Sequence, residues 1–333
     1  MTISRRRAAA LLGSTGLLAS SACTTAGTTT TRSVPPTRSS TPVPVFNAQR
    51  HILDARHIPA RFDIDVLPVG ALPMLTPQQG AEGQKVPVLF ALDGNISFPI
   101  VTATAYLLAA EMLPPMLVVG IGYEVDTSAS LGRVMVASQA HRNRDYTPSL
   151  DAIFFGRQAT MAQQLGETYP AYGKPGGAAA FLEFINLELK PFIAQHYPTA
   201  DLENSAILGD SLGGLFVIHT LLTSPRSFRC YIAGSPSLWW DNQMIFREAA
   251  SATSADVRVF LSVGSQEENE GMIEPIARLD TLLRTKILPG EGYIFHVFEG
   301  ETHSSVGGAT VSRGVRAVFE RDAQDLSREA RRG

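Results

Sequence analysis

The chain has 333 residues, of which 44% are hydrophobic and 18% charged, a globular balance that excludes collagen-like, disordered and coiled-coil classes. The formal net charge is -3, so the charge balance does not indicate a nucleic-acid-binding protein. A chain of this length can bury a full core without metals, and its two cysteines predict no disulfide framework. We expect one large α/β domain or two small ones.

Residues 1–23 have the pattern of a bacterial export signal. Three arginines at 5–7 precede an apolar stretch that is shorter than the ~20 residues a membrane span needs. The arginines favour twin-arginine export, with general secretory export as the alternative. The small residues before Cys23 predict either acylation of this cysteine, as in a lipoprotein, or cleavage after Ala22. We therefore expect a protein outside the cytoplasm, periplasmic or held at a membrane through Cys23.

The segment 24–45 is dominated by Thr, Ser and Pro, a composition that buries too little apolar surface to order itself. We interpret it as a flexible tether, the alternative being a leader without a role. The folded domain is expected to span residues 46–325, and a polar tail is expected at 326–333.

From residue 46 onward, strand patterns alternate with helix patterns. Strands are predicted at 61–69 (an exposed one), 86–92, 116–123, 204–208, 228–233, 256–263 and 293–298, and helices at 102–112, 178–196, 272–284 and 310–319. This alternation predicts an α/β fold with a mainly parallel central sheet and helices on both faces. Between Tyr123 and Gly177 no buried strand is found, and we interpret this stretch as a cap-like insertion over an active site with a short helix or two. A surface insertion without a role is the alternative.

Ser211 lies in Gly-Asp-Ser-Leu-Gly, which matches the G-x-S-x-G pattern. A strand-like segment precedes the motif and a helix-like segment follows it. A serine on such a turn is typical of the nucleophile elbow of α/β-hydrolases. The turn also places the N–H group of Leu212 at the positive end of a helix. A glycine-rich turn with a helix-capping serine is the alternative reading.

A serine hydroxyl needs a base to become a good nucleophile. In this fold the acid follows the serine and the histidine comes last. Of seven histidines, His303 alone lies beyond the last predicted strand, so it is the predicted base. Glu267, Glu268 and Glu270 follow the strand at 256–263, and Glu267 is preferred because it lies nearer the strand end than Glu268. The choice between these two, or neither, stays open.

An oxyanion hole needs two backbone N–H groups. Leu212 is expected to supply one, and the loop after the strand at 86–92 the other, from Gly94 or Asn95. No metal-ligand spacing and no nucleotide-binding loop is found, so no metal and no cofactor is expected.

Six segments run in order through most of the chain after the tether: Leu92–Asn95, Val119–Tyr123, Arg144–Pro148, Gly209–Leu215, Ser235–Trp240 and Gly300–His303. With them the chain resembles the esterase family that includes esterase D-like enzymes and the siderophore esterases that cleave trilactone iron chelators. The resemblance implies an α/β-hydrolase fold, Ser211 and His303 as nucleophile and base, and the Asn95 and Leu212 backbones as the oxyanion hole. The candidate substrate contacts are Gly94, Tyr123, Arg144, Trp239 and Trp240.

One departure from the family is Asp210, because the family usually has histidine before the serine. The resemblance also supports Glu267 as the acid less directly than it supports Ser211 and His303, since some siderophore esterases work with serine and histidine alone. We expect a serine carboxylic-ester hydrolase that acts through an acyl-enzyme on a small-molecule ester or lactone, with siderophore lactones among the substrates. An acyltransferase and a catalytically silent binding lipoprotein are the alternatives. The GDSL hydrolase class is excluded, because it has an aspartate three residues before its histidine, where this chain has Gly300.

Overall fold

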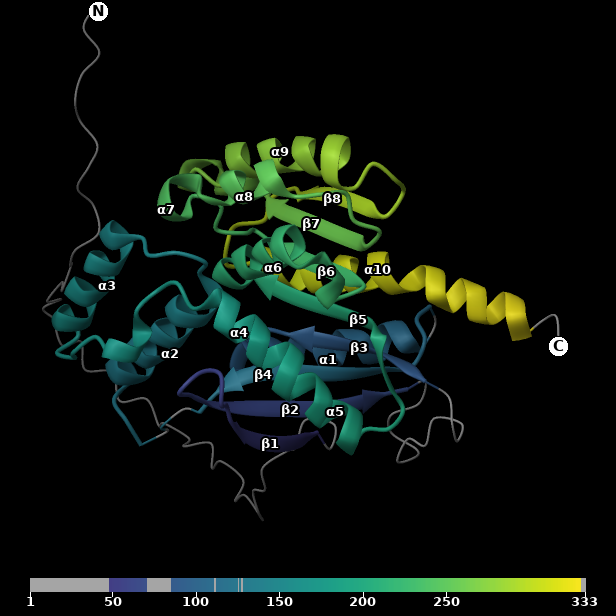
Figure 1. Ribbon diagram of the computed structural model, residues 1–333, viewed down its shortest axis with the longest axis horizontal. Helices are drawn as coiled ribbons and strands as arrows, with labels where there is room; N and C mark the ends of the chain where they lie inside the picture. Colours follow the sequence, from purple (N-terminus) through teal and green to yellow (C-terminus); the bar gives the residue numbers. More distant parts are fainter. Residues whose placement is uncertain (1–47, 71–84, 111, 125, 127, 331–333) are drawn as a thin grey trace, which may run out of the picture. The chain divides into compact units, whose positions relative to one another are not determined.

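The computed structural model describes residues 48–70 and 85–330, except 111, 125 and 127 (Figure 1). The predictions for the export segment and the tether lie outside these residues. No helix in the described part of the chain is long and apolar enough to cross a membrane.

The described part of the chain contains an eight-stranded sheet, and apolar runs in the sequence form its central strands (Figure 1). The strands are β1 (Gln49–Asp54), β2 (Arg61–Val69), β3 (Val86–Ala91), β4 (Met116–Tyr123), β5 (Ala200–Asp210), β6 (Cys230–Gly234), β7 (Arg258–Gly264) and β8 (Tyr293–Phe298). Their spatial order is β1-β2-β4-β3-β5-β6-β7-β8, and the pairs from β4 to β8 are parallel. Only β1 and β2 are antiparallel to their neighbours among the described strands. The predicted mainly parallel sheet is confirmed.

Helices cover both faces of this sheet. They are α1 (Gly94–Ala109), α2 (Leu131–Tyr146), α3 (Ala152–Gln164), α4 (Ala178–Phe184), α5 (Lys190–His196), α6 (Leu212–Thr223), α7 (Trp240–Gln243), α8 (Ile245–Ser251), α9 (Ile273–Leu282) and α10 (Val306–Ala330). Short turns are 3₁₀-helical at η1 (Ala171–Gly173), η3 (Pro225–Ser227) and η4 (Ser265–Glu270), and π-helical at η2 (Ile185–Leu189) and η5 (Leu283–Ile287).

Alternate strand residues point to opposite faces, which gives the domain two cores. Val88 and Phe90 on β3 belong to the core that includes α4, α5, α6, α8 and α9. Leu89 and Ala91 on the same strand belong to the core that includes α1 and α10. The central strands β3, β4, β6 and β7 are therefore buried on both sides, which explains their apolar sequences.

The strand order has a switch point between β3 and β5. From β3 the chain crosses to β4 on one side, whereas from β5 it crosses to β6 on the other side. Connections that leave neighbouring parallel strands in opposite directions open a binding crevice at their carboxyl ends. The loop after β3 and the turn after β5 therefore meet there, and α2 and α3 lie beyond the same edge (Figure 1).

Two strands of the sheet differ from what the sequence predicted. β1 was not predicted, because its polar sequence forms an exposed edge strand. β2 is mostly buried rather than exposed, since β1 covers its edge and Phe62 stacks on Phe184 of α4 at 4.4 Å between ring centroids. The helix predicted at 178–196 is confirmed, and it includes the π-helical turn η2 shortly before Pro191, which lacks an N–H group. The polar tail at 326–333 stays a prediction, and its backbone is helical as far as Ala330, within α10.

The insertion between β4 and α4 contains two substantial helices rather than short ones. α2 has 16 residues and α3 has 13. Ser130 and Asp151 cap them, each accepting a hydrogen bond from a backbone N–H group in the first turn.

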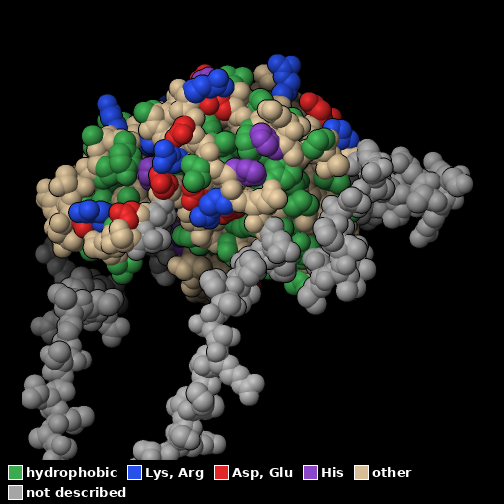
Figure 2. All heavy atoms as spheres, turned by 90° about the horizontal axis from the view of Figure 1, so that it is seen from below, with side chains coloured by type: hydrophobic (Ala, Val, Ile, Leu, Met, Phe, Trp, Pro, Cys, Tyr) green, Lys and Arg blue, Asp and Glu red, His purple; other side chains and the backbone are tan. Residues whose placement is uncertain are grey.

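Figure 2 views the molecule from below Figure 1, and on that face basic and acidic side chains are interspersed.

Candidate active site

Ser211 occupies a strained turn between β5 and α6. Its backbone angles are φ 60° and ψ −118°, a conformation that a residue with a side chain adopts only when its surroundings enforce it. A Cβ on Gly209 would lie 2.5 Å from the backbone of Gly213, and one on Gly214 would lie 2.6 Å from the Gly234 carbonyl oxygen. The tight turn therefore requires these glycines, as expected of a nucleophile elbow.

Ser211, His303 and Glu267 form a hydrogen-bonded series. Nε2 of His303 lies 3.0 Å from Oγ of Ser211, and Nδ1 of His303 lies 2.7 Å from Oε2 of Glu267. The three side chains come from connections after β5, β8 and β7, which all end at the carboxyl edge of the sheet. The arrangement has the geometry in which the histidine can take a proton from the serine while the carboxylate orients the ring.

The Glu267 carboxylate is fully buried and held from both sides. While Oε2 faces His303, Oε1 accepts hydrogen bonds from Ser235 Oγ at 2.6 Å and from the Gly264 N–H group at 2.7 Å. Burial acts to raise the pKa of Glu267, but the hydrogen bonds from His303, Ser235 and Gly264 outweigh burial and hold the pKa below its usual value. The carboxylate is thus kept ionised beside the histidine, whereas Glu268 is exposed.

Two helices begin at the carboxyl edge of the sheet, and each has a first-turn N–H group without a hydrogen-bond acceptor inside its own helix. Leu212 is the first residue of α6 and Asn95 is the second residue of α1, positions whose N–H groups have no acceptor within the helix. The Asn95 side chain is fixed to the end of β4, since it donates to the Tyr123 carbonyl oxygen at 2.9 Å and accepts from the Tyr123 N–H group at 2.7 Å. A Cβ on Gly122 would lie 2.8 Å from Asn95 Oδ1, so a glycine is needed there.

Three candidate substrate contacts are buried, which contradicts a direct contact with substrate. Gly94 packs on β4, where an added Cβ would lie 2.9 Å from the backbone of Gly120 and Ile121. Tyr123 is 3% exposed. Arg144 is 8% exposed, and its guanidinium pairs with both carboxylate oxygens of Asp145 at 2.6 and 2.7 Å. These residues pack inside the domain instead.

The two tryptophans differ in their surroundings. Trp240 has no exposed surface and donates its indole N–H to the Ser149 carbonyl oxygen at 3.1 Å, so the prediction that it contacts substrate is wrong. Trp239 is partly buried and packs on Phe154 of α3, with ring centroids 5.4 Å apart. Trp239 therefore stays a candidate contact.

Two serines of the site were not assigned from the sequence. Ser235 donates to the carboxylate of Glu267, and Ser237 places its Oγ 3.4 Å from that of Ser211. The Ser237 N–H group also donates to the Ser211 carbonyl oxygen at 3.0 Å. Their signal in the sequence is the Ser-Pro-Ser that directly follows β6, the strand beside β5.

Asp210 ends β5 directly before Ser211. Its Oδ1 is buried and accepts no hydrogen bond from the described residues. A Cβ on the neighbouring Gly234 would lie 2.4 Å from this oxygen. Burial raises the pKa of Asp210 to about 7, against the opposing effect of His303.

We expect Asp210→Asn to alter how stability depends on pH. The folded protein binds the Asp210 proton more tightly than the unfolded chain does, so this contribution to stability is complete below about pH 4 and is lost as the pH rises toward 7. Each pKa unit corresponds to about 1.4 kcal/mol, which amounts to several degrees of Tm. The Tm of Asp210→Asn should exceed that of the wild type increasingly between pH 4 and 7. A difference in Tm that is constant with pH would contradict this, and Asp201→Asn on the same strand is the control.

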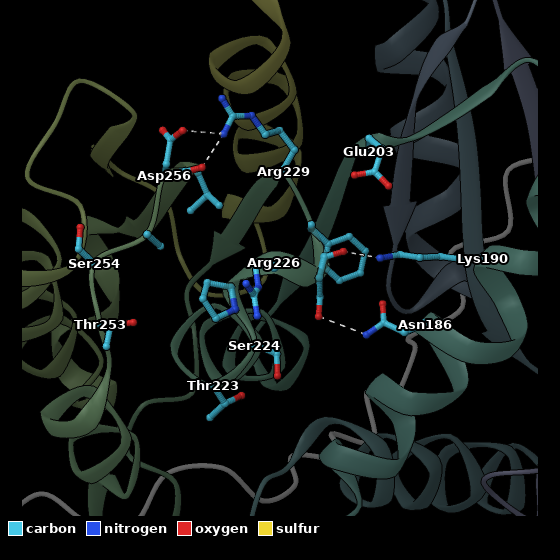
Figure 3. Close-up of a pocket in the computed structure, with 15 residues that line it drawn as sticks. Asn186, Lys190, Glu203, Thr223, Ser224, Arg226, Arg229, Thr253, Ser254 and Asp256 are labelled. Carbon is cyan, nitrogen blue, oxygen red and sulfur yellow. Dashed lines mark hydrogen bonds and ion pairs between the residues drawn. The ribbon is translucent and has the colours of Figure 1, made fainter.

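A hollow of about 1070 Å³ lies at the opposite edge of the sheet (Figure 3). Its lining includes Phe228 and Arg229 just before β6 and Asp256 just before β7, whereas Ser211 follows the carboxyl end of β5. Within the hollow, Lys190 donates to the Ser227 carbonyl oxygen, and Arg229 pairs with Asp256 (Figure 3). No predicted site residue lines it, and no described group of His, Cys, Asp and Glu could hold a metal ion.

An elbow serine, a histidine and a buried acid in this chain order, on this sheet, define a serine hydrolase of the α/β-hydrolase fold. Residues 155–307 match the family model described as "Putative esterase". The ferri-bacillibactin esterase BesA of Bacillus subtilis is 31% identical over 255 residues, which cover 72% of this chain and 81% of the relative. The protein therefore belongs to this family of esterases.

Two further comparisons agree with this assignment. A siderophore triacetylfusarinine C esterase of Aspergillus fumigatus is 28% identical over 275 residues, which cover 71% of this chain and 82% of the relative. The crystal structure of the BES protein from Bacillus cereus matches with a TM-score of 0.66 and 26% identity, over 86% of this chain and 99% of that chain. The predicted fold and esterase class are confirmed.

Proposed function

We propose that this protein opens siderophore-type lactones by hydrolysis through an acyl-enzyme on Ser211. The observation that carries the proposal is the hydrogen-bonded series from Ser211 through His303 to Glu267. The substrate class rests on the relatives, since those compared above include esterases named for ferri-bacillibactin and triacetylfusarinine C.

The first half of the reaction forms the acyl-enzyme. His303 Nε2 removes the proton of Ser211 while Oγ attacks the ester carbonyl carbon, and the N–H groups of Asn95 and Leu212 stabilise the oxyanion that results. The imidazolium then gives its proton to the departing alkoxide as the ester C–O bond breaks. Glu267 holds the ring in the required tautomer and stabilises its charged form.

The second half releases the acid. His303 removes a proton from a water molecule that attacks the acyl carbon. The bond between the acyl carbon and Ser211 Oγ then breaks, the imidazolium returns its proton to Oγ, and the carboxylic acid product leaves. In a macrocyclic trilactone the first such cycle opens the ring, because alcohol and acyl group belong to one molecule. Later cycles shorten the linear product one ester at a time.

The proposal includes the place where the reaction occurs. The basic start, the short apolar stretch and the small residues before Cys23 support export from the cytoplasm, with Cys23 as the site of a lipid anchor. A siderophore esterase outside the cytoplasm would meet its substrate at the cell envelope.

Hydrolysis of a lactone panel tests the substrate class. The purified protein is incubated with enterobactin and bacillibactin, each iron-free and ferric, and with p-nitrophenyl butyrate as a simple ester, and products are followed by chromatography and mass spectrometry. We expect ring opening of at least one trilactone with a kcat/KM at least about tenfold above that for the simple ester. Turnover of the simple ester alone would contradict the siderophore assignment and leave a general esterase.

A further inference from the structure

Asp93, the residue before the oxyanion-hole helix, has an unusual backbone. It is the N-cap of α1 and adopts a left-handed conformation with φ 54° and ψ 40°. For a residue with a side chain this conformation costs about 1 kcal/mol or more, and it persists where the surroundings enforce it. Its position matters because Asn95, the proposed oxyanion donor, lies two residues further on.

Two residues of α2 hold Asp93. The Arg142 guanidinium donates from Nε and Nη2 to the two oxygens of the Asp93 carboxylate, at 2.8 and 3.2 Å. The Tyr146 hydroxyl accepts a hydrogen bond from the Asp93 N–H group at 3.0 Å. Because Arg142 and Tyr146 are four residues apart, they share one face of the helix. Helix α2 of the insertion is thus hydrogen-bonded to the loop after β3.

The Asp93 side chain does not cap its own helix. An aspartate at this position normally accepts a hydrogen bond from the N–H group of the second or third helical residue, here Asn95 or Ile96. The structure has no such bond, and Arg142 instead engages both carboxylate oxygens. The carboxylate points instead toward the elbow, where a Cβ on Gly213 would lie 3.5 Å from Asp93 Oδ2.

We propose that Arg142 is a positioning residue that keeps the Asp93 carboxylate away from the N-terminus of α1 and so leaves the Asn95 N–H group free to bind the oxyanion. Without Arg142 the carboxylate would be free to cap α1. It would then occupy the N–H group that the reaction needs and place a negative charge where negative charge develops in the transition state. This inference rests on the proposed ester hydrolysis at Ser211.

Substitutions at Arg142 and Asp93 should compensate for each other. Arg142→Ala should lower activity because it releases the carboxylate, and Asp93→Gly in the same protein should restore part of it because the carboxylate is then gone. Glycine is chosen because it tolerates φ 54° without strain. A purely structural loss predicts the opposite, since two damaging substitutions add.

The experiment measures p-nitrophenyl acetate hydrolysis and inhibition by phenylboronic acid, which mimics the tetrahedral intermediate. Loss of one oxyanion donor costs about 10²–10³ in kcat, so Arg142→Ala should lower kcat at least about 30-fold with KM changed less than about threefold. The inhibition constant of phenylboronic acid should rise in parallel. Arg142→Lys keeps the charge without the paired hydrogen bonds, so its kcat should lie between those of the wild type and Arg142→Ala. Arg133→Ala, on the same helix and paired with Glu167, is the control.

The double variant decides the question. We expect Arg142→Ala with Asp93→Gly to have a kcat at least about fivefold above that of Arg142→Ala, since the donor is freed again. A double variant no more active than Arg142→Ala would overturn the inference. A raised KM with unchanged kcat in Arg142→Ala would also overturn it, because the arginine would then bind substrate. A wild-type protein without ester hydrolysis would overturn the proposed function and this inference with it.

Discussion

Ser211→Ala is expected to lower kcat/KM for ester hydrolysis by a factor of about 10⁴ to 10⁶, with the melting temperature preserved. The substitution removes Oγ of Ser211, which lies 3.0 Å from Nε2 of His303 directly before the first turn of α6. The measurement is a comparison of steady-state kinetics for both proteins on p-nitrophenyl butyrate and on the best lactone of the panel. Residual activity would come from direct attack of water on the ester, with the oxyanion bound by the same N–H groups of Asn95 and Leu212.

The neighbouring Ser237 provides the control for this substitution. Its Oγ lies 3.4 Å from that of Ser211, but the residue is only 2% exposed. Ser237→Ala should cost at most about tenfold, because it removes a neighbour and not the nucleophile. More than about 1% of wild-type kcat/KM in Ser211→Ala would contradict the nucleophile assignment.

Glu267→Gln is expected to lower kcat by about 10⁴, the size of the loss when the orienting acid of a serine hydrolase is removed. The carboxylate accepts hydrogen bonds on both oxygens, from His303 on one and from Ser235 and Gly264 on the other. A glutamine has one acceptor oxygen, so its amide NH₂ would face one of these donors. The buried mismatch should also lower Tm.

The exposed neighbour Glu268 offers a matched control, since Glu268→Gln makes the same chemical change one residue further on. We expect kcat and Tm of that variant to equal those of the wild type. A Glu267→Gln enzyme within tenfold of the wild type would show that Ser211 and His303 act without an orienting acid.

The nucleophile and the base could be predicted because their signals are local. A tight turn needs glycines around Ser211, and the fold places the base after the last strand, where His303 is found. Glu267 was distinguishable from Glu268 only by its distance from the strand end. What separates the two is the direction of their side chains, since one is buried against Ser235 and the other is exposed.

The walls of the crevice could not be predicted in the same way. Whether Trp240 is buried or faces a ligand depends on how Ser149 and the insertion pack over it. That insertion carries no buried strand pattern, so the sequence gives no direction for its side chains. The contact between Asp93 and Arg142 joins residues 49 positions apart and follows no local periodicity. β1 was missed because an exposed edge strand needs no apolar face.

Covalent labelling tests the assignment of Ser211 most directly. The folded protein is treated with a fluorophosphonate, digested and mapped by mass spectrometry. We predict one adduct, on the peptide that carries Ser211, in the wild type and in Ser237→Ala, and no adduct in Ser211→Ala. A folded wild-type protein that stays unlabelled, or that carries its adduct on another residue, would contradict the assignment of Ser211 as the nucleophile of this esterase.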